Sequence, residues 1–369
     1  MDSAKEKKLQ IGLAAKIIAI FCATVTFVAL IALVVSGFSS DFANFWWQHV
    51  TKPVDNAMYL FFQHIPVKYY VLLVVLAVIA GLCVLIPKVG RGFAVSMASI
   101  VLMAGVLPLL GYCQQASIDK IDTMYFSGNE QKSYTADDLY DLAIYFREKM
   151  KELAPKAIKA EQQYDTEMLV DKAVANLVWQ RREFGFLDGA IVSDIELGSY
   201  EYTGMTFPYR VTVDENYPAG ELLNTITHEL CHSKGILREN EATFCAIATE
   251  INSQDDFSKY VGYAEALRMS AIALTLEKYD TAKIKKLYGA NQGKCGIRSA
   301  ECAQIFLNVD DLGDYAAMSS DEYVDQLAPF SEGSDISMML FDRAGFDMEY
   351  DYSRSARLLL EYFDGKIEQ

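Results

Sequence analysis

The sequence predicts a mainly α-helical protein in which three transmembrane helices precede a soluble α+β domain with a small sheet and a two-helix core. Two observations predict this division. The first 118 residues contain three long apolar stretches, and the residues after them are rich in acidic side chains and in runs with helix or strand periodicity. We therefore divide the chain into a membrane domain, residues 1–118, and a soluble domain, residues 119–369.

Each of the three apolar stretches is long enough to cross a bilayer, which takes about 20 residues of helix. They cover Leu9–Val35, in which Lys16 is the one charged residue, and residues 69–87 and 92–118. A cleaved signal peptide is the alternative for the first stretch, but its apolar run exceeds the usual length of about 7–15 residues. We therefore expect a multi-pass protein of the cell membrane, with the lipid bilayer as a partner.

Aromatic residues typical of the membrane–water interface follow the first stretch and predict an interfacial helix or a re-entrant segment. They are Trp46, Trp47, Tyr59, Phe61 and Phe62.

The distribution of charge predicts both the orientation and the class of partner. Lysines precede the first span, and Lys88 and Arg91 lie between the second and third spans, which places these segments in the cytoplasm. Three spans then place the soluble domain outside the cytoplasm. This domain has a net charge of −20, and the whole chain has a net charge of −16 because the membrane domain is basic. Nucleic acid is excluded as a partner because phosphate binding needs a basic surface.

The soluble domain is predicted to be helical with two strands before its central motif. Thr135, followed by acidic residues, is a helix N-cap, and Pro155 is expected to end that helix. Branched and aromatic residues predict the strands. The remaining elements are helices at Asp165–Arg182, Glu221–Gly235 and Arg238–Glu250, and strands at Ala190–Leu197 and Thr206–Val213.

The central motif is a pair of histidines four residues apart, His228 and His232, with Glu229 beside the first. Residues at this spacing lie on one face of a helix, so both imidazoles can bind one metal ion, and imidazole is a preferred zinc ligand. Glu229 is placed to act on a metal-bound water as general base. The chain has four histidines, and two of them fall in this motif.

A catalytic zinc site has three protein ligands and one open position, so a third ligand is needed. No third histidine is near the motif, which indicates a carboxylate. Glu239 and Glu241 both lie in the first turn of the next helix, where acidic residues also stabilise the helix N-terminus. Either glutamate can be the ligand on this reasoning.

The residues after the motif resemble two known groups of proteins. Glu239, Ala242 and Thr243 resemble the Glu-x-x-Ala-Asp/Asn signature of gluzincin peptidases, with Thr243 replacing the Asp or Asn. This resemblance implies that Glu239 is the third zinc ligand.

The motif His228-Glu-x-x-His-x-x-Gly and the following Arg238-Glu-x-Glu-Ala resemble the DUF3810 family of bacterial membrane proteins, as do Tyr260–Tyr263 and the segment Tyr352–Leu360. That resemblance implies three N-terminal transmembrane segments and a zincin-like, zinc-peptidase-like domain.

These observations predict a membrane-anchored zinc metallopeptidase that hydrolyses peptide bonds of a peptide or protein with a Glu229-activated, zinc-bound water. The alternative is a membrane-anchored binding or sensory protein that has lost catalysis and keeps a structural zinc site. A structural site has no use for Glu229 and normally has a fourth ligand.

Three further residues are candidates to stabilise the oxyanion, although packing is the more common role for such residues: Tyr260, Tyr263 and Arg238. The strand at Thr206–Val213 is expected to be an edge strand, because Pro208 has no N–H to donate to the hydrogen bonds of an interior strand. Two roles are open for this strand: it binds substrate backbone by strand addition, or it only covers the helices. Cys295 and Cys302 are the candidate disulfide, and Cys231, next to His232, is expected to point to another helix face.

Overall fold

The computed structural model describes residues 2–65, 67–85, 90–119, 121–126, 133–161, 164–184, 192, 195–200, 204–206, 209–280, 282–284, 287, 352–364 and 366. The predicted Cys295–Cys302 disulfide lies outside the described residues. By their contacts, residues 1–119 together with 208–210 form one unit, and residues 120–207 with 211–369 form the other. Each unit is described by itself.

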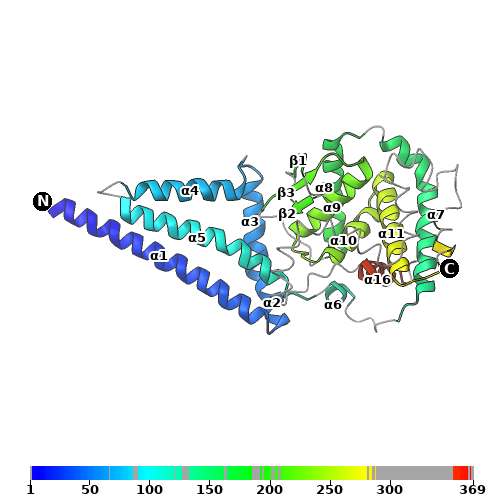
Figure 1. The fold of residues 1–369 in the computed structure, drawn as a ribbon, viewed down its shortest axis with the longest axis horizontal. Coiled ribbons are helices and arrows are strands. Elements are labelled where there is room, and N and C mark those ends of the chain that lie inside the picture. Colours follow the sequence, from blue (N-terminus) through cyan, green and yellow to red (C-terminus); the bar gives the residue numbers. More distant parts are fainter. Residues whose placement is uncertain are drawn as a thin grey trace. The chain divides into compact units, whose positions relative to one another are not determined.

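The first unit is built from long helices (Figure 1). Helix α5 packs along both α1 and α4. The elements are α1 (Asp2–Ser36), α2 (Ser40–Trp46), a π-helical segment (Trp47–Thr51), α3 (Lys52–Phe62), α4 (Tyr69–Cys83) and α5 (Gly90–Gln115).

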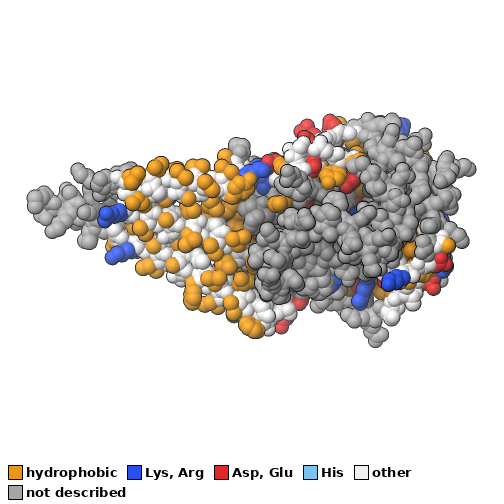
Figure 2. Space-filling model, in the orientation of Figure 1, with side chains coloured by type: hydrophobic (Ala, Val, Ile, Leu, Met, Phe, Trp, Pro, Cys, Tyr) orange, Lys and Arg blue, Asp and Glu red, His pale blue; other side chains and the backbone are white. Residues whose placement is uncertain are grey.

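Among the described residues, two helices are long and apolar enough to cross a membrane, Gly12–Ser36 and Arg91–Gln115. A core helix of a soluble protein can be equally long and apolar, but such a helix is mostly buried. In these two helices only 11% and 6% of the most apolar 18-residue segment is buried. Hydrophobic side chains cover the visible surface of α1, α4 and α5 in Figure 2. These features favour contact with lipid for both helices.

The prediction of three full spans is corrected by α4. The apolar stretch at residues 69–87 forms a helix of 15 residues that ends at Cys83, followed by a turn in which Val84 N–H donates to the carbonyl of Gly81. A helix of this length rises about 22 Å, which is less than the hydrocarbon thickness of about 30 Å. The described residues therefore contain two helices of spanning length and one shorter apolar helix.

Tyr209 belongs to the first unit by its contacts and interrupts the predicted strand Thr206–Val213. Its ring packs edge-on against Tyr59 and Tyr69 and stacks on Phe62, with centroid distances of 5.7, 5.2 and 6.0 Å. Its φ of 60° lies in the left-handed region, which is sterically costly for a bulky residue and cannot continue a strand. The single predicted strand is therefore two strands, β2 (Gly204–Thr206) and β3 (Val211–Asp214), and Pro208 lies outside the described residues.

The second unit contains seven described helices and a three-stranded sheet. The helices are α6 (Ile121–Tyr125), α7 (Ala136–Glu161), α8 (Thr166–Glu183), α9 (Ala219–Ser233), α10 (Glu239–Ile251), α11 (Asp256–Leu276) and α16 (Tyr352–Phe363). Helix α11 packs against α7, α10 and α16, and α9 packs against α8 and α10. The prediction of a mainly helical chain with a small sheet is confirmed.

The sheet has the order β1–β3–β2, with strands β1 (Ile195–Gly198), β2 (Gly204–Thr206) and β3 (Val211–Asp214). Strand β3 is central and pairs parallel to β1 and antiparallel to β2. Strand β2 is thus an edge of this sheet, and it packs against α9.

Local sequence signals account for the helix starts. Thr135 and Asp138 form a reciprocal capping box before α7, and Asp165 accepts a hydrogen bond from Met168 N–H at the start of α8. The prediction that Pro155 ends the first helix is wrong, because α7 continues to Glu161. Buried Ala154 and Ala157 flank the proline, and this packing outweighs the lost hydrogen bond.

Glu250, on α10, is a carboxyl group fully buried in the second unit. Asn224 Nδ2 donates to its Oε2 at 3.0 Å, and its Oε1 has no hydrogen-bond partner among the described residues. Burial raises the pKa of Glu250 to about 8, against the opposing effect of the Asn224 hydrogen bond. The folded protein therefore keeps Glu250 protonated at neutral pH.

Replacing Glu250 with Gln should remove a pH dependence of stability. The folded state holds a proton that the unfolded state releases above pH 4.5, so the contribution of the neutral carboxyl is complete below pH 4.5 and is lost as pH rises to about 8. Between these values the free energy of unfolding should fall by about 1.4 kcal/mol per pH unit in the wild type relative to Glu250→Gln. Denaturant unfolding of the full chain in detergent, at pH 5 to 8, measures this.

Glu152→Gln is the matched control, because that side chain is 68% exposed and should leave the slope unchanged. Parallel stability curves for the wild type and Glu250→Gln would contradict the assignment of a neutral buried carboxyl.

Candidate metal centre

Helix α9 carries the motif histidines on the face opposite its buried side. Leu223, Ile226 and Leu230 are fully buried, whereas the His228 and His232 side chains are 17% and 13% exposed. The helix ends where sequence predicts, since Gly235 has a φ of 93° and its N–H donates to the carbonyl of His232 at 2.9 Å. The chain then turns and enters α10 directly at Glu239.

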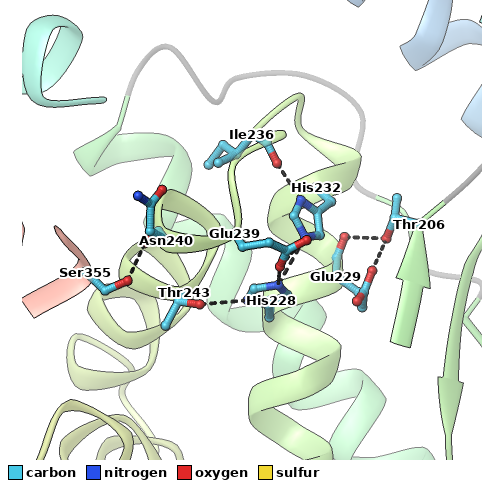
Figure 3. A network of polar contacts seen from close by, with 9 residues as sticks. All are labelled: Thr206, His228, Glu229, His232, Ile236, Glu239, Asn240, Thr243 and Ser355. Carbon is cyan, nitrogen blue, oxygen red and sulfur yellow. Dashed lines mark hydrogen bonds and ion pairs between the residues drawn. The ribbon is translucent and has the colours of Figure 1, made fainter. Parts of the chain in front are cut away.

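This turn brings three donor atoms to one point (Figure 3). The Nε2 atoms of His228 and His232 are 3.0 Å apart, and Glu239 Oε2 lies 3.0 Å from the first and 3.5 Å from the second. All three side chains are partly buried, so the point lies at the margin of the unit rather than in its core.

The spacing fits a small tetrahedral cation. Zinc binds imidazole nitrogen and carboxylate oxygen at about 2.0–2.1 Å, so its ligand atoms lie about 3.3 Å apart in tetrahedral geometry. The three observed separations lie on both sides of that value. Two nitrogen donors and one oxygen donor are also a set that zinc accepts, and a triangle of three donors leaves the fourth position open.

Neighbouring groups orient both imidazoles. His232 Nδ1 is 2.6 Å from the carbonyl of Ile236, so this nitrogen carries the proton and Nε2 presents its lone pair toward the cluster. His228 Nδ1 is 3.4 Å from the hydroxyl of Thr243. Thr243 stands where the gluzincin signature has Asp or Asn, and its hydroxyl lies beside the first imidazole.

The structure separates the two glutamates that sequence left as alternatives. Glu239 contacts both imidazoles. Glu241 is 3% exposed and accepts a hydrogen bond from Ile121 N–H at 3.1 Å, with Arg238 at 3.5 Å and Arg354 at 3.7 Å. Glu241 thus joins the starts of α6, α10 and α16, and Glu239 is the carboxylate that faces the histidines.

Glu229 lies next to the cluster but is held by a different partner. Its carboxylate oxygen lies within 4.8 Å of the ring nitrogens of His228 and His232. The hydroxyl of Thr206 donates to Glu229 Oε2 at 2.7 Å, and Glu229 is 7% exposed. Burial raises the pKa of Glu229, while the two histidines and Thr206 oppose the rise. This carboxylate is placed to exchange a proton beside the three donors His228, His232 and Glu239, which together form the donor triangle.

The charges of the cluster favour a cation. Burial lowers the pKa of His232, but the carboxylates of Glu239 and Glu229 outweigh burial and raise it to about 9. Burial acts to raise the pKa of Glu239, and the two histidines lower it well below its usual range. A proton and a metal ion compete for the same imidazole nitrogen, so the negative charge that retains a proton on His232 also attracts a metal ion.

Three other predicted residues, Cys231, Tyr263 and Arg238, have described contacts elsewhere in the second unit, and Tyr260 is buried. Cys231 accepts a hydrogen bond from Gln180 Nε2 at 3.1 Å and lies in the α8–α9 interface. Tyr260 is 1% exposed, and Tyr263 packs against Phe146. Arg238 lies beside Glu241. These contacts are structural ones, and the role of an oxyanion stabiliser stays a prediction for Tyr260, Tyr263 and Arg238.

Comparison with known families confirms the DUF3810 resemblance. Residues 42–295 match the family model described as a protein of unknown function, DUF3810. The chain belongs to the DUF3810 family. No curated protein and no solved structure matches it in the corresponding searches. The matched range includes the whole donor triangle of this DUF3810 chain and Glu229.

Sequence reasoning missed two groups at this DUF3810 site, the hydroxyl of Thr206 and the carbonyl of Ile236. Thr206 is 23 residues from Glu229 in the chain, and nothing in the local pattern indicates the contact. The Ile236 contact could have been inferred from sequence, because a helix that ends at Gly235 places the carbonyls of the following residues near its last turn.

Glu241→Gln should destabilise this DUF3810 protein far more than Glu239→Gln does. Removing the Glu241 charge breaks its ion pairs with two arginine side chains that are 7% and 13% exposed, and breaking a buried ion pair costs about 3–5 kcal/mol. Glu239 is 28% exposed and its loss can be compensated by water. Denaturant unfolding of the full chain in detergent with a chelator present compares the two variants, and equal losses would contradict the separate roles.

Proposed function

We propose that this DUF3810 protein is a membrane-anchored zinc metallopeptidase in which His228, His232 and Glu239 bind zinc and Glu229 is the general base. The observation that carries the proposal is the convergence of three donor atoms within 3.5 Å, with a fourth, separately held carboxylate beside them. A zincin-like fold of the second unit is part of the same proposal, supported by the two motif helices α9 and α10 and the sheet edge beside them.

A zinc ion held there would supply Lewis-acid chemistry, polarising the scissile carbonyl and making water more acidic. The chain's own groups supply the rest. Glu229 takes a proton from the attacking water and then passes it to the leaving amine. Ile236 and Thr243 keep the two imidazoles in orientation, and the buried leucine face of α9 fixes the helix that carries them.

Peptide is the proposed substrate class. Strand β2 is an edge of the sheet and packs against α9, so an extended peptide could pair with the side of β2 that has no strand beside it among the described residues, while the carbonyl of the peptide approaches the cluster. Backbone pairing would give affinity without selecting one sequence. The edge strand proposed for this role is Gly204–Thr206, in place of the longer strand expected from sequence.

The cell membrane is the proposed location. Basic residues lie in the first two turns of α1 and next to the start of α5, and placing both starts in the cytoplasm puts the end of α5, and the catalytic unit after it, outside the cytoplasm. This orientation requires the chain between α1 and α5 to return across the bilayer, and α4, with 15 residues, would do so only where the bilayer thins locally.

A second candidate function is a binding or sensory protein with a structural zinc site, which the replacement of Asp or Asn by Thr243 favours. Two features weigh against it. A structural site normally has four protein ligands, and the nearest cysteine, Cys231, is engaged with Gln180. A structural site also gives no role to Glu229.

Glu229→Gln should abolish hydrolysis and spare zinc binding. The substitution keeps the shape of the side chain and its contact with Thr206 but removes the proton acceptor, and loss of a general base lowers the rate by about 10²–10⁴-fold. The measurement is cleavage of a pooled set of internally quenched fluorescent peptides by the full chain in detergent, with zinc content determined on the same samples. Full activity of the variant would remove Glu229 from the mechanism, and an inactive wild type with bound zinc would favour the structural site.

A further inference from the structure

The edge strand β2 makes two contacts with Glu229 that no sequence motif indicates. The hydroxyl of Thr206 lies 2.7 Å from Glu229 Oε2 and 2.8 Å from the main-chain oxygen of the same residue (Figure 3). One hydroxyl therefore faces both the carboxylate and the helical backbone that carries it. This pair of contacts limits the rotation of the Glu229 side chain.

Gly204 closes the other side of the carboxylate. A Cβ atom at position 204 would lie 2.6 Å from Glu229 Oε1, 2.7 Å from Cγ and 2.9 Å from Cδ. Any side chain at this position would displace Glu229. Positions 204 and 206 lie on the same face of a strand, since side chains alternate, so the strand presents a bare backbone and one hydroxyl to the same glutamate.

The strand that makes these contacts is itself fixed. Gly204 pairs with Val213, Met205 with Thr212 and Thr206 with Val211. Val211 and Val213 are fully buried in the second unit, so β3 anchors the register of β2. A slip of one residue would replace Thr206 by Met205 at the carboxylate.

We propose that Gly204 and Thr206 are positioning residues that fix the Glu229 carboxylate for proton transfer. This inference rests on the proposed function for its catalytic consequence, but the contacts themselves are testable without activity. Thr206 donates its hydroxyl proton to Oε2, and the backbone at Gly204 packs against Oε1, so both oxygens are held in place beside the donor triangle. A general base must lie within hydrogen-bond reach of the proton that it removes, and a rigid support keeps it there.

The first experiment measures the contacts through stability. Thr206→Val and Gly204→Ala are made in the wild-type and Glu229→Ala backgrounds of the full chain in detergent, with a chelator present. Glu229→Ala deletes Cγ, Cδ and both carboxylate oxygens, so it removes the acceptor of Thr206 and the atoms that a residue-204 Cβ would meet. Each β2 substitution should change the unfolding equilibrium constant by about tenfold or more in the wild type and by less than about threefold in Glu229→Ala.

Thr212→Val is the matched control. Thr212 lies on β3 and pairs with Met205, so its side chain is on the sheet face opposite to positions 204 and 206, and its hydroxyl donates to the Met205 carbonyl at 3.2 Å. Its cost should therefore be the same in both backgrounds. Equal costs of Thr206→Val and of Gly204→Ala in the two backgrounds would overturn the inference.

The second experiment measures turnover of the quenched peptides by the zinc-loaded full chain. Thr206→Val should lower kcat by about tenfold to a hundredfold with a KM change below about threefold, because misplacement of a catalytic group slows the chemical step. Thr206→Ser keeps the hydroxyl and should restore most of kcat, and Thr212→Val should stay within about twofold of the wild type. Gly204→Ala should lose turnover while retaining zinc.

The outcomes separate this inference from the proposed function. Normal kcat in Thr206→Val, in an active protein, would overturn the positioning role and leave the peptidase proposal intact. Coupled stability costs in a wild type that hydrolyses none of the peptides would support the contacts and contradict the peptidase proposal.

Discussion

The reversal of the chain between α9 and α10 is the constraint on which the candidate site depends. Two histidines at helical spacing supply only two donors, and the third comes from the next helix because Gly235 adopts a left-handed conformation and ends α9 just after His232. The same turn places the Ile236 carbonyl against His232 Nδ1. One short connection thus supplies the third donor, orients one imidazole, and leads into the helix that carries Thr243 beside the other.

The second constraint is the sheet edge on the opposite side of α9. A helix alone does not fix a long acidic side chain, and here β2 holds Glu229 through Thr206 and the bare backbone of Gly204. The donor triangle and the general base are therefore supported by different elements, α10 and β2, with α9 common to both. Burial of Leu223, Ile226 and Leu230 fixes α9 in the core, so the helix keeps its position relative to both α10 and β2.

Much of the site follows from sequence, since helix periodicity places His228 and His232 together and Gly235 marks the helix end. The choice between Glu239 and Glu241 does not follow, because residues two apart differ by about 200° around a helix and both lie in an acidic first turn. Only the packing of α10 decides which one meets the imidazoles. The contact of Thr206 with Glu229 is equally hidden, since it depends on sheet register. In the first unit, hydropathy extends the second span to residue 87, whereas the helix ends at Cys83, after Gly81.

Zinc content of the purified full chain tests the central claim most directly. After dialysis against metal-free buffer, the wild type and Glu241→Gln should retain close to one zinc per chain, and His228→Ala and Glu239→Ala should lose it. Comparison of the two glutamate variants identifies the third ligand, because the two residues lie in the same helical turn and carry the same charge. Zinc retained in Glu239→Ala but lost in a folded Glu241→Gln, or a folded wild type that binds no zinc, would contradict the account.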